Sequence, residues 1–466
     1  MATVKIKKVY VCSSCNKEYP KMAGKCQDCG EWNTISEKEM IVENKSATKT
    51  VGSIVAATGY SNLSKEIKTL SNVESVDSKR VETSWAALNN LFGRNGIVEG
   101  SVNLISGEPG IGKSTFLLQL INDIAVKDYK TLYISGEESD VQINLRAMRL
   151  NLNRDIIHNL NDNNLENVIK TLREFKPRFI VVDSIQTIYS ELVPSNPGSV
   201  SQVTTATASI NAVCKELGIT AFIVGHVTKD GGIAGPKVIE HMVDAIFSFE
   251  GDSSSNYRSL RAIKNRNAST EEMVILEMKE EGLNIIEDAS LLFLDEYGNN
   301  FQTEVGSVIF AGIENNQSLL LEVQSLVNVV ESGGGKKIGM GVEYNRIAII
   351  LGIISKELGS TKEVMKTELF VKLASTIKIN DSGIDLPILL SIVSNLQNRP
   401  VKESTAVFGE MSLSGKLKLG RNFEKRINMV NRAKIKNIIM PMIKDDEVKN
   451  EIINKYKNIN FIMCNN

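Results

Sequence analysis

The sequence predicts an α/β fold of several domains, with helices on both faces of a mostly parallel sheet. The chain has 466 residues, of which 42% are hydrophobic and 23% charged, so it can bury more than one core. Apolar strand-like runs alternate with helical patterns over residues 102–286, which is typical of a parallel sheet covered by helices. Four of the six cysteines lie near the N-terminus at a spacing that indicates a zinc module.

The N-terminal cysteines are Cys12, Cys15, Cys26 and Cys29, in a C-x2-C-x10-C-x2-C array. Each pair brings two sulfurs together in one turn, and four thiolates around a tetrahedral Zn²⁺ make a closed structural site. Two disulfides are the alternative, but the chain begins with a lysine-rich stretch where a secretory signal would be apolar. We therefore expect a reducing cytoplasmic location and zinc bound to residues 1–33.

The rest of the chain divides by composition. Residues 34–80 are polar, apart from short apolar bursts such as 54–57, and are predicted to be a linker. After residue 291 a Gly-rich turn and helical patterns at 346–358 and 387–396 indicate a second α/β domain. No apolar stretch is long enough to span a bilayer. The strand-like runs of the central region are 102–106, 131–135, 179–183, 219–225, 245–249 and 260–264.

The strongest motif is a P-loop, G-x4-G-K-S/T, between a strand-like run and a helical pattern. Its glycines allow backbone N–H groups to surround a β-phosphate, Lys113 would reach the β- and γ-phosphates, and Ser114 would bind Mg²⁺. ATP and Mg²⁺ are the expected ligands. The predicted nucleotide contacts are Gly107, Glu108, Pro109, Gly110, Ile111, Gly112, Lys113, Ser114 and Thr115.

Other polar residues follow neighbouring strand-like runs, where open α/β sheets bind ligands. Asp183 ends an apolar run and is predicted to hold the water shell of Mg²⁺, although such an Asp can also be an ordinary helix cap. Glu137 and Glu138 follow another run, and an acid there could polarise the attacking water. His226 could sense the γ-phosphate, or it could be a structural histidine.

Beyond these motifs, long strings resemble the RadA family, also called Sms, of bacterial RecA-like recombination ATPases. The resemblance implies a hexameric ring around single-stranded or branched DNA, ATP hydrolysis between subunits, branch migration during DNA repair, and the recombinase RecA as a partner. The similar strings are Tyr133-Ile-Ser-Gly-Glu-Glu-Ser139, Asp183-Ser-Ile-Gln-Thr-Ile-Tyr189, Pro197-Gly-Ser-Val-Ser-Gln202, Gly225-His-Val-Thr-Lys229, Ile233-Ala-Gly-Pro236, Glu240-His-Met-Val-Asp244 and Phe249-Glu-Gly-Asp252.

The resemblance also assigns roles. Glu137 takes the place of the RecA-type catalytic glutamate, and residues 229–236 resemble the loop that faces DNA in the ring channel. The family signature Lys-Asn-Arg-Phe-Gly begins here at Lys264, with Arg266 retained but Asn and Ala in the last two positions, 267 and 268. Lys264 and Arg266 are predicted to act as a finger on a neighbour's γ-phosphate. The alternative is a basic strand end on the surface.

Residues 291–442 are similar to the proteolytic domain of Lon, most clearly at Asn398-Arg-Pro-Val401 and Phe408-Gly-Glu-Met-Ser-Leu-Ser-Gly415. Proteolysis would need a Ser/Lys dyad. By this resemblance Gly383 takes the place of the nucleophilic Ser and Glu424 takes the place of the Lys. We therefore expect this domain to serve ring assembly and DNA contact.

The predicted division is a zinc finger (1–33), a linker (34–80), a RecA-like ATPase (81–290) and a Lon-protease-like domain without the dyad (291–466). The net charge of −1 means that any DNA contact depends on local basic patches. The leading function is a DNA-dependent ATP motor. An ATP-dependent Ser/Lys protease and a nucleotide-gated DNA-binding adaptor are the alternatives.

Overall fold

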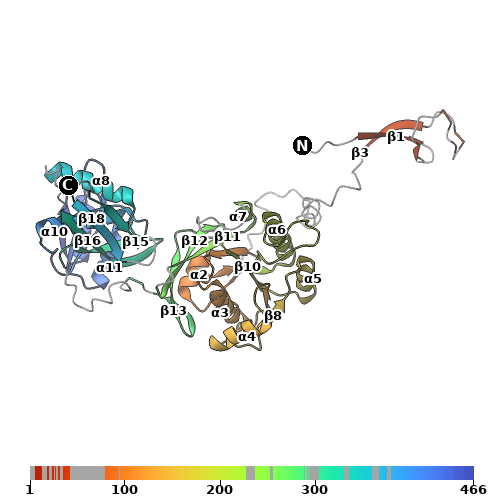
Figure 1. Ribbon diagram of the computed structural model, residues 1–466, viewed down its shortest axis with the longest axis horizontal. Helices are drawn as coiled ribbons and strands as arrows, with labels where there is room; N and C mark the ends of the chain where they lie inside the picture. Colours follow the sequence, from red (N-terminus) through yellow and green to blue (C-terminus); the bar gives the residue numbers. More distant parts are fainter. Residues whose placement is uncertain are drawn as a thin grey trace. The chain divides into compact units, whose positions relative to one another are not determined.

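Figure 1 shows the computed structural model, which divides into two units, Met1–Ser61 and Asn62–Asn466, each described by itself. The structure describes residues 6–12, 18–19, 24–25, 27, 30–31, 35–41, 79–93, 95–226, 237–251, 255–287, 289–290, 292, 304–329, 335–358, 367–374 and 379–465. Among these residues, no helix is both long enough and apolar enough to cross a bilayer.

The first unit contains a three-stranded antiparallel sheet of order β2-β1-β3. Its strands are β1 (Ile6–Cys12), β2 (Glu18–Tyr19) and β3 (Ile35–Ile41). Strand β3 pairs with β1 along its whole length and lies in the range that the sequence assigns to the linker. Residues 42–78, which include the apolar burst 54–57, lie outside the described residues.

The second unit begins with a nine-stranded sheet of order β14-β13-β12-β11-β6-β10-β9-β7-β8. Its strands from β11 to β8 are parallel, and β12 to β14 add an antiparallel edge. All six predicted strand runs are confirmed. The strands are β6 (Val102–Gly107), β7 (Thr131–Ser135), β8 (His158–Asn161), β9 (Phe179–Asp183), β10 (Thr220–His226), β11 (Ala245–Glu250), β12 (Tyr257–Asn265), β13 (Met273–Lys279) and β14 (Gly282–Ile286).

Helices cover both faces of this sheet, because successive side chains of each buried strand point to opposite sides. Val181 packs with one group of helices (α2, α3 and α4), whereas its neighbours Ile180 and Val182 pack with another (α5 and α6). The helices are α2 (Ala86–Gly93), α3 (Lys113–Ala125), α4 (Asp140–Arg149), α5 (Leu165–Phe175), α6 (Val200–Leu217) and α7 (Lys237–Met242), and a short ribbon joins β4 (Arg80–Val81) to β5 (Ile97–Val98).

A second sheet has the order β17-β18-β16-β15-β19-β22-β23. Its strands are β15 (Ser307–Glu314), β16 (Gln317–Val329), β17 (Lys337–Met340), β18 (Thr367–Ala374), β19 (Thr405–Val407), β22 (Asn437–Pro441) and β23 (Asn460–Cys464). The elements around it are α8 (Tyr344–Leu358), the 3-10 turn η3 (Ser382–Ile384), α10 (Asp385–Gln397), the hairpin strands β20 (Glu410–Met411) and β21 (Leu417–Lys418), α11 (Phe423–Arg432) and α12 (Asp446–Lys455). The two predicted helices of this region correspond to α8 and α10.

The two sheets of this unit are joined by packing and by charge. Met273 and Ile275 of β13 belong to the same apolar cluster as the second sheet. Arg261 of β12 pairs with Glu314 of β15 at 3.1 Å and with Glu250 of β11 at 3.2 Å. Because Arg261 and Glu314 are both buried, their charges compensate each other where water is excluded.

Candidate functional site

The predicted P-loop connects β6 to α3 at the carboxyl edge of the first sheet. A Cβ atom at Gly107 would lie 2.6 Å from the carbonyl oxygen of Phe249, so only glycine allows this approach to strand β11. Gly112 has φ 117° and forms the N-cap of α3, which directs the first N–H groups of the helix into the loop. The loop therefore has the backbone shape that surrounds a phosphate.

Lys113 is folded back into this loop. Its Nζ donates to the carbonyl oxygens of Gly107 at 2.9 Å and Glu108 at 2.7 Å, and the residue is 4% exposed. Burial lowers the pKa of Lys113, while the nearby charges of Asp183 and Glu137 act to raise it. The Lys113 ammonium can replace its hydrogen bonds to loop carbonyls with hydrogen bonds to phosphate oxygens. This cluster therefore fits a nucleoside triphosphate.

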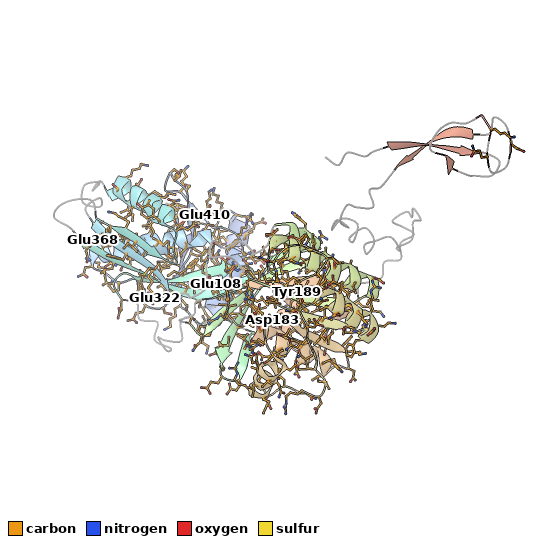
Figure 2. The ribbon with its side chains drawn as sticks, turned by 45° about the vertical axis from the view of Figure 1, so that its right-hand side comes forward. Glu108, Asp183, Tyr189, Glu322, Glu368 and Glu410 are labelled. Carbon is orange, nitrogen blue, oxygen red and sulfur yellow. The ribbon has the colours of Figure 1, made fainter. Side chains whose placement is uncertain are left out.

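Asp183 ends β9 beside the P-loop (Figure 2), and it is buried. The Tyr133 hydroxyl donates to Asp183 Oδ2 at 2.6 Å and orients the carboxylate. Burial and the charge of Asp183 raise the pKa of Tyr133 well above its usual value, so this tyrosine remains a donor. A buried carboxylate so near Lys113 fits the predicted Mg²⁺ role.

The two adjacent glutamates after β7 have different surroundings. Glu137 Oε1 accepts a hydrogen bond from Ser184 Oγ and lies 3.4 Å from His226 Nε2. The interaction with His226 is the largest cause that lowers the pKa of Glu137, ahead of the opposing effect of burial. Glu138 instead pairs with Arg146 of α4 at 2.5 Å. Glu137 is therefore the one of the two glutamates whose pKa is lowered and whose charge interacts with Lys113 of the P-loop.

Sequence reasoning missed Tyr133 and Ser184 as members of this cluster. Tyr133 is 1% exposed in the centre of β7, and a hydroxyl there needs a buried partner. A tyrosine in an otherwise apolar strand run could therefore have indicated a buried hydrogen-bond partner. Ser184 follows Asp183 directly and gave no signal of its own, because its contact with Glu137 depends on how β7 and β9 lie side by side.

The structure does not bring Lys264 and Arg266 to the P-loop of their own chain. Lys264 pairs with Ile246, which pairs with Leu104, whereas the P-loop begins three residues further along β6. At roughly 3.3 Å per residue this places Lys264 about 10 Å back from the carboxyl edge and two strands to the side. Lys264 Nζ donates to the Val243 carbonyl at 2.8 Å, and Arg266 Nη2 donates to the His241 carbonyl at 3.2 Å.

Asn267 and Ala268, the two positions that differ from the family signature, pack against Arg80 and Gly93. The backbone N–H of Asn267 donates to Asn265 Oδ1 at 2.9 Å, and Arg80 Nη2 donates to the Asn267 carbonyl at 3.4 Å. Ala268 Cβ would lie 3.6 Å from a Cβ atom at Gly93, at the end of α2. Asn267 and Ala268 thus hold the strand end that carries Arg266. Burial and the neighbouring Arg266 lower the pKa of Lys264.

The predicted dyad position in the second domain needs a correction. Glu424 is exposed in the first turn of α11, and the side chain beside Gly383 is Arg426 instead. A Cβ atom at Gly383 would lie 3.0 Å from Arg426 Nη1. Arg426 makes a bidentate ion pair with Asp381, at 2.6 and 2.9 Å, with both side chains buried. An arginine stays protonated and cannot serve as a general base, so the expected absence of a dyad now depends on Gly383 and Arg426.

Two predicted sites lie outside this geometry. Cys12 ends strand β1, but Cys15, Cys26 and Cys29 lie outside the described residues, as does the whole predicted DNA loop, residues 229–236. Within the described residues, no group of three or more His, Cys, Asp or Glu side chains could hold a metal ion. The zinc ligands and the DNA loop remain predictions.

A P-loop at the edge of a mostly parallel sheet, with carboxylates from two neighbouring strands, defines a RecA-like P-loop ATPase domain. Comparison with known families agrees. A family described as "AAA domain" matches residues 67–232, "Rubredoxin metal binding domain" matches 10–37, and "Subunit ChlI of Mg-chelatase" matches 346–444.

Curated relatives extend the match over nearly the whole chain. DNA repair protein RadA of Bacillus subtilis is 38% identical over 94% of this chain and 93% of its own. The RadA proteins of Pseudomonas aeruginosa (36% identical, 94% and 93%) and Aquifex aeolicus (38% identical, 95% and 95%) are similar to the same extent. Among solved structures, a KaiC-like protein of Pyrococcus horikoshii is 16% identical over 45% of this chain and 99% of its own, with a TM-score of 0.38. The chain belongs to the RadA family of DNA repair proteins.

Proposed function

We propose that this protein is a DNA-dependent ATPase of recombinational repair, a ring-shaped motor that drives branch migration. One observation carries the proposal. Lys113, Asp183 and Glu137 lie close together in one chain, whereas Lys264 and Arg266 lie two strands away from the P-loop strand and back from its carboxyl end. If these basic residues act on ATP, they must therefore act on the nucleotide of a neighbouring subunit, as the proposed ring requires.

Each residue has a separate task in this proposal. Lys113 and the backbone N–H groups of the P-loop would bind the phosphates, and Asp183 would help to hold Mg²⁺, which would neutralise phosphate charge. Glu137 accepts a proton from the water whose oxygen attacks the γ-phosphorus. The bond to the β–γ bridging oxygen breaks, and ADP leaves with the electron pair. Ser184 and His226 hold the Glu137 carboxylate in position.

The partners of the motor follow from the family. Single-stranded and branched DNA are the proposed substrates, residues 229–236 are the proposed contact with DNA, and the recombinase RecA is the proposed protein partner. Zn²⁺ is the metal proposed for Cys12, Cys15, Cys26 and Cys29, since a module of this size cannot bury enough apolar surface without a crosslink. A cytoplasmic location stays a prediction from the sequence.

The test is a mixture of inactive variants. Lys113→Ala removes the charge that acts in its own subunit, and Arg266→Ala removes the proposed finger on the neighbour's nucleotide. Mixing the two should restore some ATP turnover, because composite sites form with an intact P-loop and an intact finger. The matched control mixes Lys113→Ala with Glu137→Gln. Both substitutions affect the nucleotide pocket of their own subunit, so every pocket in this mixture is defective.

Turnover is measured with and without single-stranded DNA, and subunit exchange is checked with labelled protein. Known arginine fingers contribute about 10³ to 10⁵ in rate, so restoration by even a few composite sites stands above background. If the first mixture stays at the level of the control while subunits exchange, the trans assignment is wrong. If DNA leaves the wild-type rate unchanged, the motor proposal is wrong.

A further inference from the structure

The second sheet has a pocket of about 480 Å³ that is lined by both apolar and polar residues, the uncharged ones including Ser307, Gln324 and Ser325. Its apolar lining comes from Val305, Leu326, Met340 and Phe370, with Glu304 and Lys372 beside them. The strand register explains the cluster, because Leu326 of β16 lies opposite Phe370 of β18, and Phe370 lies opposite Ile338 of β17. Leu326 is 53% exposed and Met340 48% exposed, so this row of apolar side chains faces solvent.

The apolar side chains of the pocket lie on the sheet face that α10 does not cover, whereas Gly306 and Ser325 of the lining are hydrogen-bonded to α10. Val308 of β15 packs with Leu386 of α10, and Val308 lies opposite Val323 of β16. Val323 and Leu326 are three residues apart on one strand, so their side chains point to opposite faces. The neighbours of Phe370 on β18 are buried, as this alternation requires.

The hairpin β20–β21 presents a single apolar side chain on a rigid turn. Leu413 at its tip is 78% exposed. The Ser412 N–H donates to the Lys416 carbonyl at 3.0 Å and the Gly415 N–H donates to the Ser412 carbonyl at 2.9 Å, so the turn is closed by its own hydrogen bonds. The turn therefore presents Leu413 to solvent in a backbone conformation that binding need not change, which lowers the entropy cost of binding.

This hairpin is anchored on the α10 side of the domain. The Met411 N–H donates to Asp385 Oδ2 at 2.9 Å, and Arg346 of α8 pairs with the other oxygen of Asp385 at 2.5 Å. A Cβ atom at Gly415 would lie 3.6 Å from Ile353 of α8. Figure 2 shows Glu410, at the start of the hairpin, apart from Glu368 and Glu322 on the strands of the pocket.

We infer that Leu413 of one copy of this chain inserts into the pocket between Leu326, Met340 and Phe370 of a second copy. Charge supports this occupant. Lys416, three residues after Leu413 at the hairpin tip, is exposed and complements the exposed Glu304 at the pocket.

Because the hairpin and the pocket lie on different sides of one domain, the contact is head-to-tail. Each copy then offers a hairpin to one neighbour and a pocket to the other, and contacts of this kind close into rings. The inference rests on the proposed ring motor and names the surfaces that would join its subunits. One hairpin in one pocket is smaller than a stable interface, so the contact fixes the register of neighbours that also touch elsewhere.

The direct test places a photocrosslinking amino acid at position 413 of the full-length chain. After irradiation, mass spectrometry should find crosslinks between two copies, at peptides that contain Leu326, Met340 or Phe370. Crosslinks within one chain, between two hairpins, or to other peptides while the protein is oligomeric would overturn the inference.

A second test uses charge. Leu413→Asp should weaken self-association on the order of 10- to 100-fold in sedimentation experiments, since an apolar side chain no longer fills the pocket. Leu396→Asp is the matched control, because Leu396 is also exposed, on α10, and does not line the pocket. Equal effects of the two variants would count against the inference.

The two proposals can fail separately. Crosslinks at the pocket without restored turnover in the mixed variants would support this contact and contradict the trans role of Lys264 and Arg266. Restored turnover with crosslinks at other peptides would support the ring motor and contradict this contact.

Discussion

Exchanging Glu137 for glutamine should abolish ATP turnover while ATP binding survives. Glutamine has nearly the same size and can still accept the hydrogen bond that Ser184 Oγ donates. It has no carboxylate to take the proton of the attacking water. A positioned general base contributes typically about 10² to 10⁴ in rate, which corresponds to about 2.7 to 5.4 kcal/mol of activation free energy.

Binding should change little, because the charges around Lys113 are redundant. Glu137 is one of three carboxylates that raise the pKa of Lys113, and Asp183 and Glu108 remain in the variant. We therefore expect Lys113 to stay protonated and to bind phosphates. A fluorescent ATP analogue measures binding, and phosphate release with saturating ATP and single-stranded DNA measures turnover.

Glu138→Gln is the matched control, since it makes the same chemical change one residue away. It removes a partly exposed ion pair with Arg146, which contributes at most about 1 kcal/mol to stability. Its turnover should stay within about threefold of wild type, well below the loss expected for a general base. Equal losses in the two variants, or a Glu137→Gln protein that retains turnover, would refute the assignment of Glu137.

Three further predictions concern the other parts of the molecule. His226→Ala should move the acid limb of the turnover–pH profile to higher pH, because the pKa of Glu137 is no longer lowered by its largest cause; an unmoved limb contradicts this. Arg426→Ala should lower the free energy of unfolding by about 3 to 5 kcal/mol in thermal melts, because buried Asp381 loses its partner, and an unchanged melt would show that the pair is unimportant. Elemental analysis should find one zinc per chain in the purified wild-type protein and almost none in Cys26→Ala. ATP binding should be the same in the two proteins. Wild-type protein without zinc would contradict the zinc site.

The strands of the first sheet could be predicted because their residues are buried on both sides. Residues 179–182 are all apolar, as expected for a parallel strand that is covered on both faces. Strand β8, at the sheet edge, gave no such signal, since its sequence His-Asn-Leu-Asn is mostly polar and exposed. The antiparallel edge β12–β14 was predicted only at β12, because hairpin pairing depends on partners that periodicity does not identify.

The nucleotide cluster shows the same division between local and tertiary information. The P-loop is contiguous, so its residues could be named from the sequence alone. The choice between Glu137 and Glu138 depends on contacts with Ser184 and Arg146, which belong to a neighbouring strand and to α4. The error at Glu424 has a similar origin, because two residues of offset on α11 decide which side chain reaches Gly383.

The contacts around Gly383 connect the missing Ser/Lys pair at this position to the proposed contact between subunits. Exchanging Gly383 for serine would supply a nucleophile but no base, because Arg426 stays protonated and paired with Asp381. The same segment has a structural task, since the Gly409 N–H donates to the Gly383 carbonyl at 2.8 Å and the Leu386 N–H donates to the Gly409 carbonyl at 3.0 Å. Gly409 directly precedes the hairpin that carries Leu413. Gly383 therefore holds the base of the hairpin through its carbonyl, and we expect the domain to need this contact for the assembly that we propose even if it has no protease activity.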